Sequence, residues 1–326
     1  MKKKIIISIC LIAALVSVLC SCTLPESLTN YNYSTPRPTA TTPPNIEIEE
    51  LEMVSVIRGN YISEEIVEGF SCTVYENGVQ IDGITEENTS TAVVIPEKLL
   101  GYTVIGIGKE AFYNNTALQT VELPLSLKYI DTAAFCYCTN LEINTLPDGL
   151  VYVGSRAFNF CESIVEMDFP DGVTYIGEHV LSSTNVANID IPLSMDYVPV
   201  GLYYNTKISD VKIPEHVTRI DASAFANCSL VEKLVITSNV IEMNDRAFAY
   251  NHNLTTIVIE EGLTALSYGV FAGCLKLESI TIPESVVSVG NGSFLECDDE
   301  FVIIGKEGSR AEEFALEQKY EFIVME

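Results

Sequence analysis

Five cysteines recur at one place in the repeating sequence and are its most reactive side chains. They are Cys138, Cys161, Cys228, Cys274 and Cys297, each three residues after a phenylalanine. Thiols so placed could form disulfides outside the cytoplasm or, with four converging ligands, hold zinc. Equivalent positions carry Asn115, Thr184, Thr206 and Asn251, and no histidine is adjacent to the cysteines. We therefore expect a ladder of small, buried, free thiols, with no metal site and no cofactor.

The carboxylates are numerous, but their spacing does not mark a catalytic pair. The 45 Asp and Glu residues outnumber the 18 Lys and Arg residues, for a formal net charge of -27, which argues against nucleic acid as a partner. The chain has no Trp and only 3 His, residues that often stack on ligands or transfer protons. It also lacks P-loop, G-x-S-x-G, H-E-x-x-H and calcium-loop patterns. We expect no catalytic residues and a protein that is not an enzyme.

A repeat of 22 or 23 residues determines where these side chains lie. Its proline register runs through Pro124, Pro147, Pro170, Pro192, Pro214 and Pro283, and its aromatic register through Phe112, Phe135, Phe158, Phe225, Phe248, Phe271 and Phe294. The alternation Ile280-x-Ile282 predicts a strand with one buried face, which Pro283 ends. A short helical turn is expected before the aromatic residue. Because one unit cannot bury its own apolar face, about nine units are expected to stack into a β-rich solenoid over residues 92–302.

The repeat resembles the leucine-rich repeats, because Leu118-x-x-Val121-x-Leu123 matches their L-x-x-L-x-L opening. It is most similar to the bacterial BspA-like (Treponema-type) subfamily, as Ile213-Pro214, Ile176-Gly177 and Ala157-Phe158 with Cys161 show. The resemblance covers about two-thirds of the chain. It implies a leucine-rich repeat solenoid that acts as a surface-displayed binding module or adhesin.

Some units depart from the repeat pattern. Asn144 stands at an expected core position, Leu181 and Tyr203 replace the phenylalanine near the shorter repeats, and Pro199 takes a turn position. Two interpretations remain open. The departures are ordinary drift between repeats, or they mark a local bend or a ligand-contacting irregularity around Tyr197, Tyr203 and Tyr204.

The outward positions of the repeated strands predict a contact surface. In stacked strands these positions form columns on one face. The candidate protein-binding residues in these columns are Glu166, Asp168, Asp190, Asp210, Lys212, Lys233, Val235 and Val258. The apolar pair Val235 and Val258 favours a partner surface. The alternative is that β-branched residues are present only because they favour strands.

The first residues predict export. Lys2, Lys3 and Lys4 precede an apolar run over residues 5–19, as in a signal peptide, here residues 1–21. The sequence Leu19-Cys20-Ser21-Cys22 is similar to the bacterial lipobox, which implies that Cys22 is lipidated and anchors the protein at the cell surface. An ordinary signal peptide or an uncleaved anchor is the alternative. Residues 22–50 hold this site and a Pro- and Thr-rich linker.

Both ends of the repeats are expected to carry caps. Residues 51–91 form the N-terminal cap, with a hairpin that turns at Asn77-Gly78; residues 51–68 are not placed. Residues 303–326 form the C-terminal cap, in which Ser309 caps a helix with Glu312 as its capping-box partner, followed by a strand over residues 320–324.

Two functions fit this organisation. The first is a non-catalytic, lipid-anchored surface protein that binds a protein partner from the host or the bacterial surface through its repeat sheet. The second is an envelope-associated enzyme, or a subunit that captures peptides or glycans, and it is weakened by the lack of Trp and of a catalytic constellation. A passive spacer without any partner is a third possibility.

Overall fold

The structure is a computed structural model that describes residues 46–87, 89–298 and 300–325. All the described residues belong to one compact unit, Asn45–Glu326. The predicted signal peptide, Cys22 and nearly all of the predicted linker lie outside the described residues. In the described ranges, no helix combines the length and the apolar composition that a membrane crossing requires.

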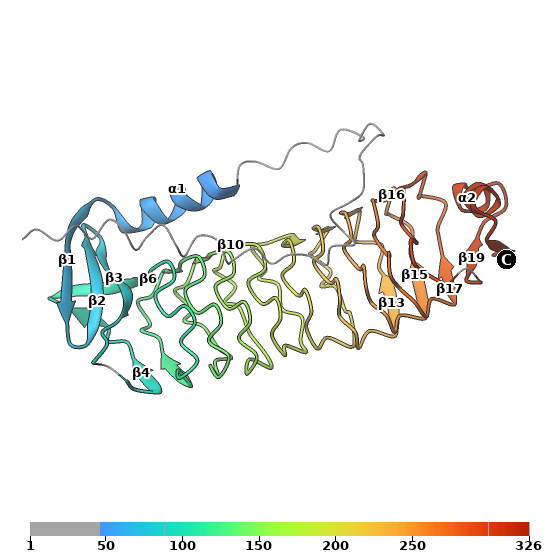
Figure 1. The fold of residues 1–326 in the computed structure, drawn as a ribbon. Helices are drawn as coiled ribbons and strands as arrows, with labels where there is room; N and C mark the ends of the chain where they lie inside the picture. The colour runs from blue at the N-terminus through green and yellow to red at the C-terminus, as the bar shows by residue number, and fades with distance from the viewer. Residues whose placement is uncertain (1–45, 88, 299, 326) are drawn as a thin grey trace, which may run out of the picture. The chain divides into compact units, whose positions relative to one another are not determined.

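Each repeat folds into one coil with three sides, and the coils stack into the β-rich solenoid that the sequence predicts (Figure 1). The first side carries the alternating strand, the second carries the V-x-x-I-G segment, and the third carries the turn with the aromatic residue. The apolar residues of all three sides point inward, because no single coil can bury them alone. The structure has about 11 coils, slightly more than predicted.

The strands of the first side pair in parallel. They are β4 (Ala92–Val94), β7 (Thr120–Glu122), β13 (Lys233–Ile236), β15 (Thr256–Ile259), β17 (Ser279–Thr281), β19 (Val302–Gly305) and β20 (Glu321–Val324). β4 pairs with β7, and the others form a 5-stranded sheet in the order β13-β15-β17-β19-β20. In the described chain, the stretch between these two groups has only an isolated bridge from Thr145 to Asp168 on this side.

The second side forms a row of short strands. They are β6 (Tyr102–Ile107), β8 (Tyr129–Ile130), β9 (Tyr152–Val153), β10 (Tyr175–Ile176), β11 (Tyr197–Val198), β12 (Arg219–Ile220), β14 (Glu242–Met243), β16 (Ala265–Leu266) and β18 (Ser288–Val289). β5 (Lys98–Leu99) pairs antiparallel with β6. The row is divided, since β8 to β10 continue the N-terminal sheet, whereas β11-β12-β14 and β16-β18 form sheets of their own.

The turns of the third side are linked from coil to coil by backbone hydrogen bonds. In one coil the N–H groups of Ala133 and Phe135 donate to carbonyl oxygens of the next coil, at 2.9 and 2.8 Å. Ala133 and Tyr137 have φ angles of 55° and 63°, and this pair of left-handed residues recurs along the array. A right-handed helix excludes such residues, so the predicted short helical turns are wrong and the segments are hydrogen-bonded turns.

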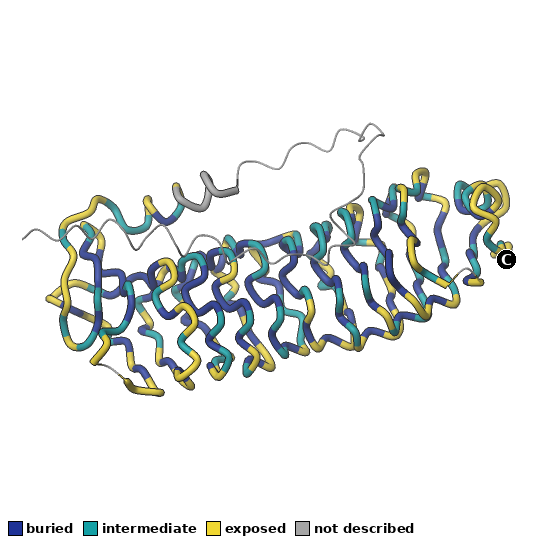
Figure 2. The backbone as a smooth tube through the Cα atoms, in the orientation of Figure 1, coloured by how far each residue is buried: buried dark blue, intermediate teal, exposed yellow. Residues whose placement is uncertain are grey.

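The aromatic residues of the turns stack along the core. The ring centroids of Phe112 and Phe135 lie 5.0 Å apart with nearly parallel planes, and those of Phe225 and Phe248 lie 5.2 Å apart. Figure 2 shows buried segments in every coil of the array. Leu181 has no ring, and it separates the stack into two runs.

The ladders between coils weaken together where the repeat shortens to 22 residues. On the second side, β10 and β11 belong to different sheets. On the first side, side chains replace strand pairing: the N–H of Phe169 donates to the carboxylate of Asp190 at 2.6 Å, and the N–H of Met167 donates to the amide oxygen of Asn188 at 3.3 Å. We call residues 167–203 the coil junction. The junction favours the second interpretation of the sequence departures, a local irregularity of the array.

The N-terminal cap contains the predicted hairpin and an additional helix. β1 (Tyr61–Val67), β2 (Phe70–Tyr75) and β3 (Gly78–Ile84) form an antiparallel meander whose last strand pairs with β6. The helix α1 (Ile46–Arg58) falls partly in the stretch that the sequence did not place. Its Val54 packs on Ile105, Tyr129 and Tyr152 of the second side.

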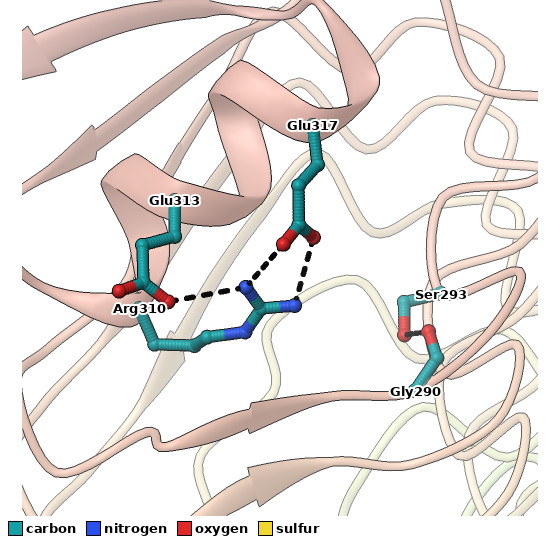
Figure 3. A network of polar contacts seen from close by, with 5 residues as sticks. All are labelled: Gly290, Ser293, Arg310, Glu313 and Glu317. Atoms are coloured by element: carbon teal, nitrogen blue, oxygen red, sulfur yellow. Dashed lines mark hydrogen bonds and ion pairs between the residues drawn. The ribbon is translucent and has the colours of Figure 1, made fainter.

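The C-terminal cap consists of α2 (Arg310–Gln318) and β20. Ser309 stands at the N-cap, but its hydroxyl makes no capping bond, and the Glu312 carboxylate accepts the N–H of Gly308 at 2.6 Å. The predicted capping box is therefore wrong in its bonds, although the helix is where it was predicted. Arg310 forms ion pairs with Glu313 and Glu317 within α2 (Figure 3). Residues of α2 and of the last coil line a cavity of about 300 Å³.

Candidate protein-binding surface

The outward column of the C-terminal sheet is an apolar stripe that one threonine interrupts. Val235 lies beside Val258 in the register of β13 and β15, and Val258 lies beside Thr281 of β17. Their neighbours Leu234, Ile257 and Ile280 point into the core. Val235 is 45% exposed and Val258 is half-buried. The structure therefore brings these two predicted residues together on one face.

The stripe extends further than the sequence indicated. Thr281 pairs with Ile304 of β19, and Ile304 pairs with Ile323 of β20. Ile304 and Ile323 were not among the predicted site residues, because they lie beyond the last phenylalanine of the repeat. The alternation of Val302 and Ile304 in the sequence indicates a further strand of this kind. The position of Ile323 in the same column follows only from the pairing of β19 with β20, which α2 separates in the sequence.

The two basic residues of the predicted site are exposed, one at the start of this sheet and one in the coil before it. Lys233 begins β13. Lys212 lies one coil earlier, where the structure has no strand, and its ammonium group forms an ion pair with Asp210. Both side chains of that pair are largely exposed, so the pair contributes little to folding stability.

The acidic residues of the predicted site differ in exposure. Glu166, Asp168 and Asp210 are exposed. Asp190 is half-buried, and its carboxylate accepts the N–H of Phe169. Burial raises the pKa of Asp190, and the nearby Asp168 raises it further. The structure thus gives Asp190 an internal role within the coil junction.

Tyr203 holds the same segment from the inside. Its buried hydroxyl donates to the carbonyl oxygen of Asp190 at 2.8 Å and accepts the N–H of Asp190 at 2.9 Å. The hydroxyl therefore satisfies both backbone groups of a residue that has no strand partner. Burial raises the pKa of Tyr203, which keeps the hydroxyl protonated for this role.

The repeated cysteines are free thiols, as expected, and they are buried except for the half-buried Cys297. Each donates to the carbonyl oxygen of an aromatic residue in the preceding coil, as Cys138 does to Phe112 at 3.0 Å and Cys161 does to Phe135 at 3.0 Å. Burial raises the pKa of Cys138 to about 12, so this thiol is a poor nucleophile. Asn251 makes the same contact with Phe225 at 3.1 Å.

The described residues do not assemble a metal site, since no group of at least three His, Cys, Asp or Glu side chains converges in them. The histidine His179 lies in a turn, where burial and the nearby Arg156 lower its pKa to about 4. Its ring packs edge-on against Tyr204. Among the described residues, the apolar stripe is thus a better candidate for a functional site than a metal site is.

Comparisons with known proteins agree with this architecture. A family model described as "BspA type Leucine rich repeat region" matches 6 copies, over residues 91–200 and 196–320. A search of curated proteins gave no match. A solved "leucine rich cell surface protein" from Faecalibacterium prausnitzii is 21% identical to this chain, with 76% of this chain and 77% of that chain covered and a TM-score of 0.53.

Two further solved structures are similar over most of their length. A leucine-rich repeat protein from Eubacterium ventriosum is 13% identical, with 71% of this chain and 85% of that chain covered and a TM-score of 0.41. The pneumococcal vaccine antigen PcpA is 12% identical, with 81% and 99% covered and a TM-score of 0.36.

Proposed function

Because the chain belongs to the BspA-type leucine-rich repeat family, we propose that it is a non-catalytic module that binds a protein partner through the outward face of its repeat sheet. The observation that carries this proposal is the apolar stripe of Val235, Val258, Thr281, Ile304 and Ile323. Solvent-facing apolar residues gathered on one face are typical of interaction surfaces.

The proposal includes a place for the protein. The lipobox-like sequence before Cys22 supports export and lipid anchoring at the bacterial cell surface. The linker that follows would hold the repeats away from the membrane. In this position the module acts as an adhesin or as a receptor for another surface protein.

The test compares partner capture by surface variants. Val235→Asp combined with Val258→Asp places two carboxylates in the stripe, and Lys212→Glu combined with Lys233→Glu reverses the charge beside it. Burying two unpaired charges under a partner should reduce captured protein from host or bacterial surface extracts by about tenfold or more. The bands are quantified by mass spectrometry.

Val287→Asp is the matched control, because Val287 is 72% exposed near β18 on the second side. It should capture as much partner as the unmodified chain. All variants should unfold at nearly the same temperature, since surface substitutions change stability by only about 0.5 kcal/mol. Equal capture by the unmodified chain and by both stripe variants would contradict the proposal.

A further inference from the structure

We infer that the partner contributes an extended segment which pairs with the open edge of β20, and that this segment has alternating apolar residues flanked by Lys or Arg. This inference rests on the proposed function, because it extends the apolar stripe to its last strand. The proposed mode of binding is the addition of a strand to the sheet, and the proposed partner segment is apolar with basic ends.

The first argument is that the stripe reaches the edge of the sheet still exposed. β20 is the terminal strand in the order β13-β15-β17-β19-β20. Ile323 is 47% exposed, and Met325, the next outward residue, is 45% exposed. The backbone beside the label C in Figure 2 is correspondingly marked as exposed. A strand added to β20 would continue the apolar column by one more side chain.

The second argument concerns the backbone of β20. The N–H of Met325 donates to the carbonyl oxygen of Gly305 at 2.7 Å, so alternate residues of this strand face β19. By the alternation of a strand, the N–H and C=O groups of Phe322 and Val324 face away from β19. Within the described chain no other strand pairs with β20. These groups form a template for another strand.

The third argument is that β20 lacks the features that normally block an edge. It contains no proline, no lysine and no bulge, and Glu321 at its first position is its one charged residue. The strand β1, which is the edge of the N-terminal sheet, differs because Glu64 and Glu65 stand in its middle. Charges within an edge strand discourage pairing, so the C-terminal edge is the better template.

Charge identifies the occupant. Glu278 precedes β17, Glu321 begins β20, and Glu261 and Glu307 follow β15 and β19; all are exposed. Exposed lysines also lie at these strand ends: Lys306 is ion-paired with Glu284, and Lys276 and Lys319 stand near the starts of β17 and β20. Carboxylates still outnumber them, so the strand ends favour cationic residues at both ends of the added segment. A second copy of this chain brings the same net charge of -27, which opposes self-pairing.

The experiment measures binding of a labelled peptide to the full chain by fluorescence anisotropy at low ionic strength. The probe is the synthetic peptide Lys-Lys-Val-Thr-Val-Thr-Val-Lys-Lys. Val324→Pro removes an outward N–H and leaves the pairing with β19 intact, and it should weaken binding by about tenfold. Val324→Ala is the matched control, because it keeps the N–H, and its affinity should stay within about twofold of the unmodified chain.

Additional variants keep the inference falsifiable if Val324→Pro unfolds. Ile323→Asp should also weaken binding by about tenfold, and a peptide with Glu in place of each Lys should bind about tenfold more weakly than the probe. Equal binding of both peptides, or equal binding by all variants, would overturn the inference. So would a dimer of the unmodified chain in light scattering that Val324→Pro abolishes, because the occupant would then be a second copy.

The two proposals can fail separately. If the double Val235→Asp, Val258→Asp variant loses its partner while Val324→Pro keeps it, the sheet face binds and the edge does not. If neither variant changes capture, both proposals are overturned.

Discussion

At the scale of single residues, Tyr203 shows how one hydroxyl can replace a strand neighbour. The equivalent residue in most coils is a phenylalanine, which only fills the core. At the coil junction the backbone of Asp190 has no strand partner, and the Tyr203 hydroxyl satisfies its N–H and C=O at once. A buried backbone group left without a partner costs about 1–3 kcal/mol, so the tyrosine is a structural requirement of its coil.

Tyr203→Phe should therefore lower the free energy of unfolding by about 1–3 kcal/mol. The ring and its stacking on Phe225 remain, while both hydrogen bonds to Asp190 are lost. Tyr61→Phe is the control, because Tyr61 is 60% exposed on β1. Urea unfolding followed by circular dichroism measures both. Equal stability of the two variants would show that water replaces the hydroxyl at no cost.

The recurrent cysteines mark the limit of sequence reasoning at this scale. Their periodicity and the presence of Asn251 and Thr206 at equivalent places correctly predicted small, buried, unlinked side chains. The sequence does not reveal why cysteine and asparagine are used at this position, because the reason is a hydrogen bond to a carbonyl oxygen in the preceding coil. The Cys138 thiol and the Asn251 amide donate a hydrogen bond to that carbonyl oxygen, whereas the Thr206 hydroxyl donates to the Tyr203 carbonyl oxygen of its own coil.

At the scale of elements, the turns differ most from expectation. Each third-side turn holds two left-handed residues, and glycine fills some of these positions, as at Gly201 and Gly269. Elsewhere Arg156 or His179 takes the same conformation. Because bulky residues rarely adopt it, sequence patterns favoured a helical turn. Hydrogen bonds to the next coil, which local sequence does not reveal, stabilise the left-handed form.

Gly201→Ala should destabilise the protein through two effects. Its φ of 59° is strained for alanine, at a cost of about 1–2 kcal/mol, and the new Cβ would lie 2.2 Å from the His179 ring. The ring must then move toward water, which raises the pKa of His179 from about 4 toward its ordinary value. NMR titration of His179 and thermal unfolding follow the two effects.

Gly101→Ala separates strain from collision. Gly101 has a φ of 84°, and nothing lies within 4 Å of its added Cβ. This variant should show the cost of strain alone and an unchanged titration of His179. If Gly201→Ala were no less stable than Gly101→Ala, the His179 ring would move aside at no cost in stability, which contradicts the predicted collision.

At the scale of the whole molecule, the repeat predicted the fold because the same physical requirement recurs in every coil. Period-two strands, prolines and the aromatic register predicted that the units stack and which residues form the core. The candidate surface stays a prediction: the structure places Val235 beside Val258, whereas the half-buried carboxylate of Asp190 accepts the N–H of Phe169. The extension to Ile323 depends on the path of the chain around α2, which no repeat pattern encodes.

The proposed anchor gives a prediction at this scale. Cys22→Ala should abolish incorporation of a labelled fatty acid and should move the protein out of the membrane fraction, because the acylated residue is missing. Cys20→Ala is the matched control and should keep the label. Labelling of Cys22→Ala at the level of the unmodified protein would contradict lipidation at this site.

The coil junction has a consequence for cooperativity. Unfolding of a solenoid spreads through the interfaces between neighbouring coils. At the junction the second-side sheet is divided, Leu181 interrupts the ring stack, and side chains stand in for strand pairing. The second-side row is also divided between β14 and β16, but there the ring stack is unbroken. We therefore expect the coils on either side of the junction to share the weaker interface. The array is expected to open as two blocks, so that the N-terminal coils could exchange their amide protons while the coils bearing the stripe stay closed.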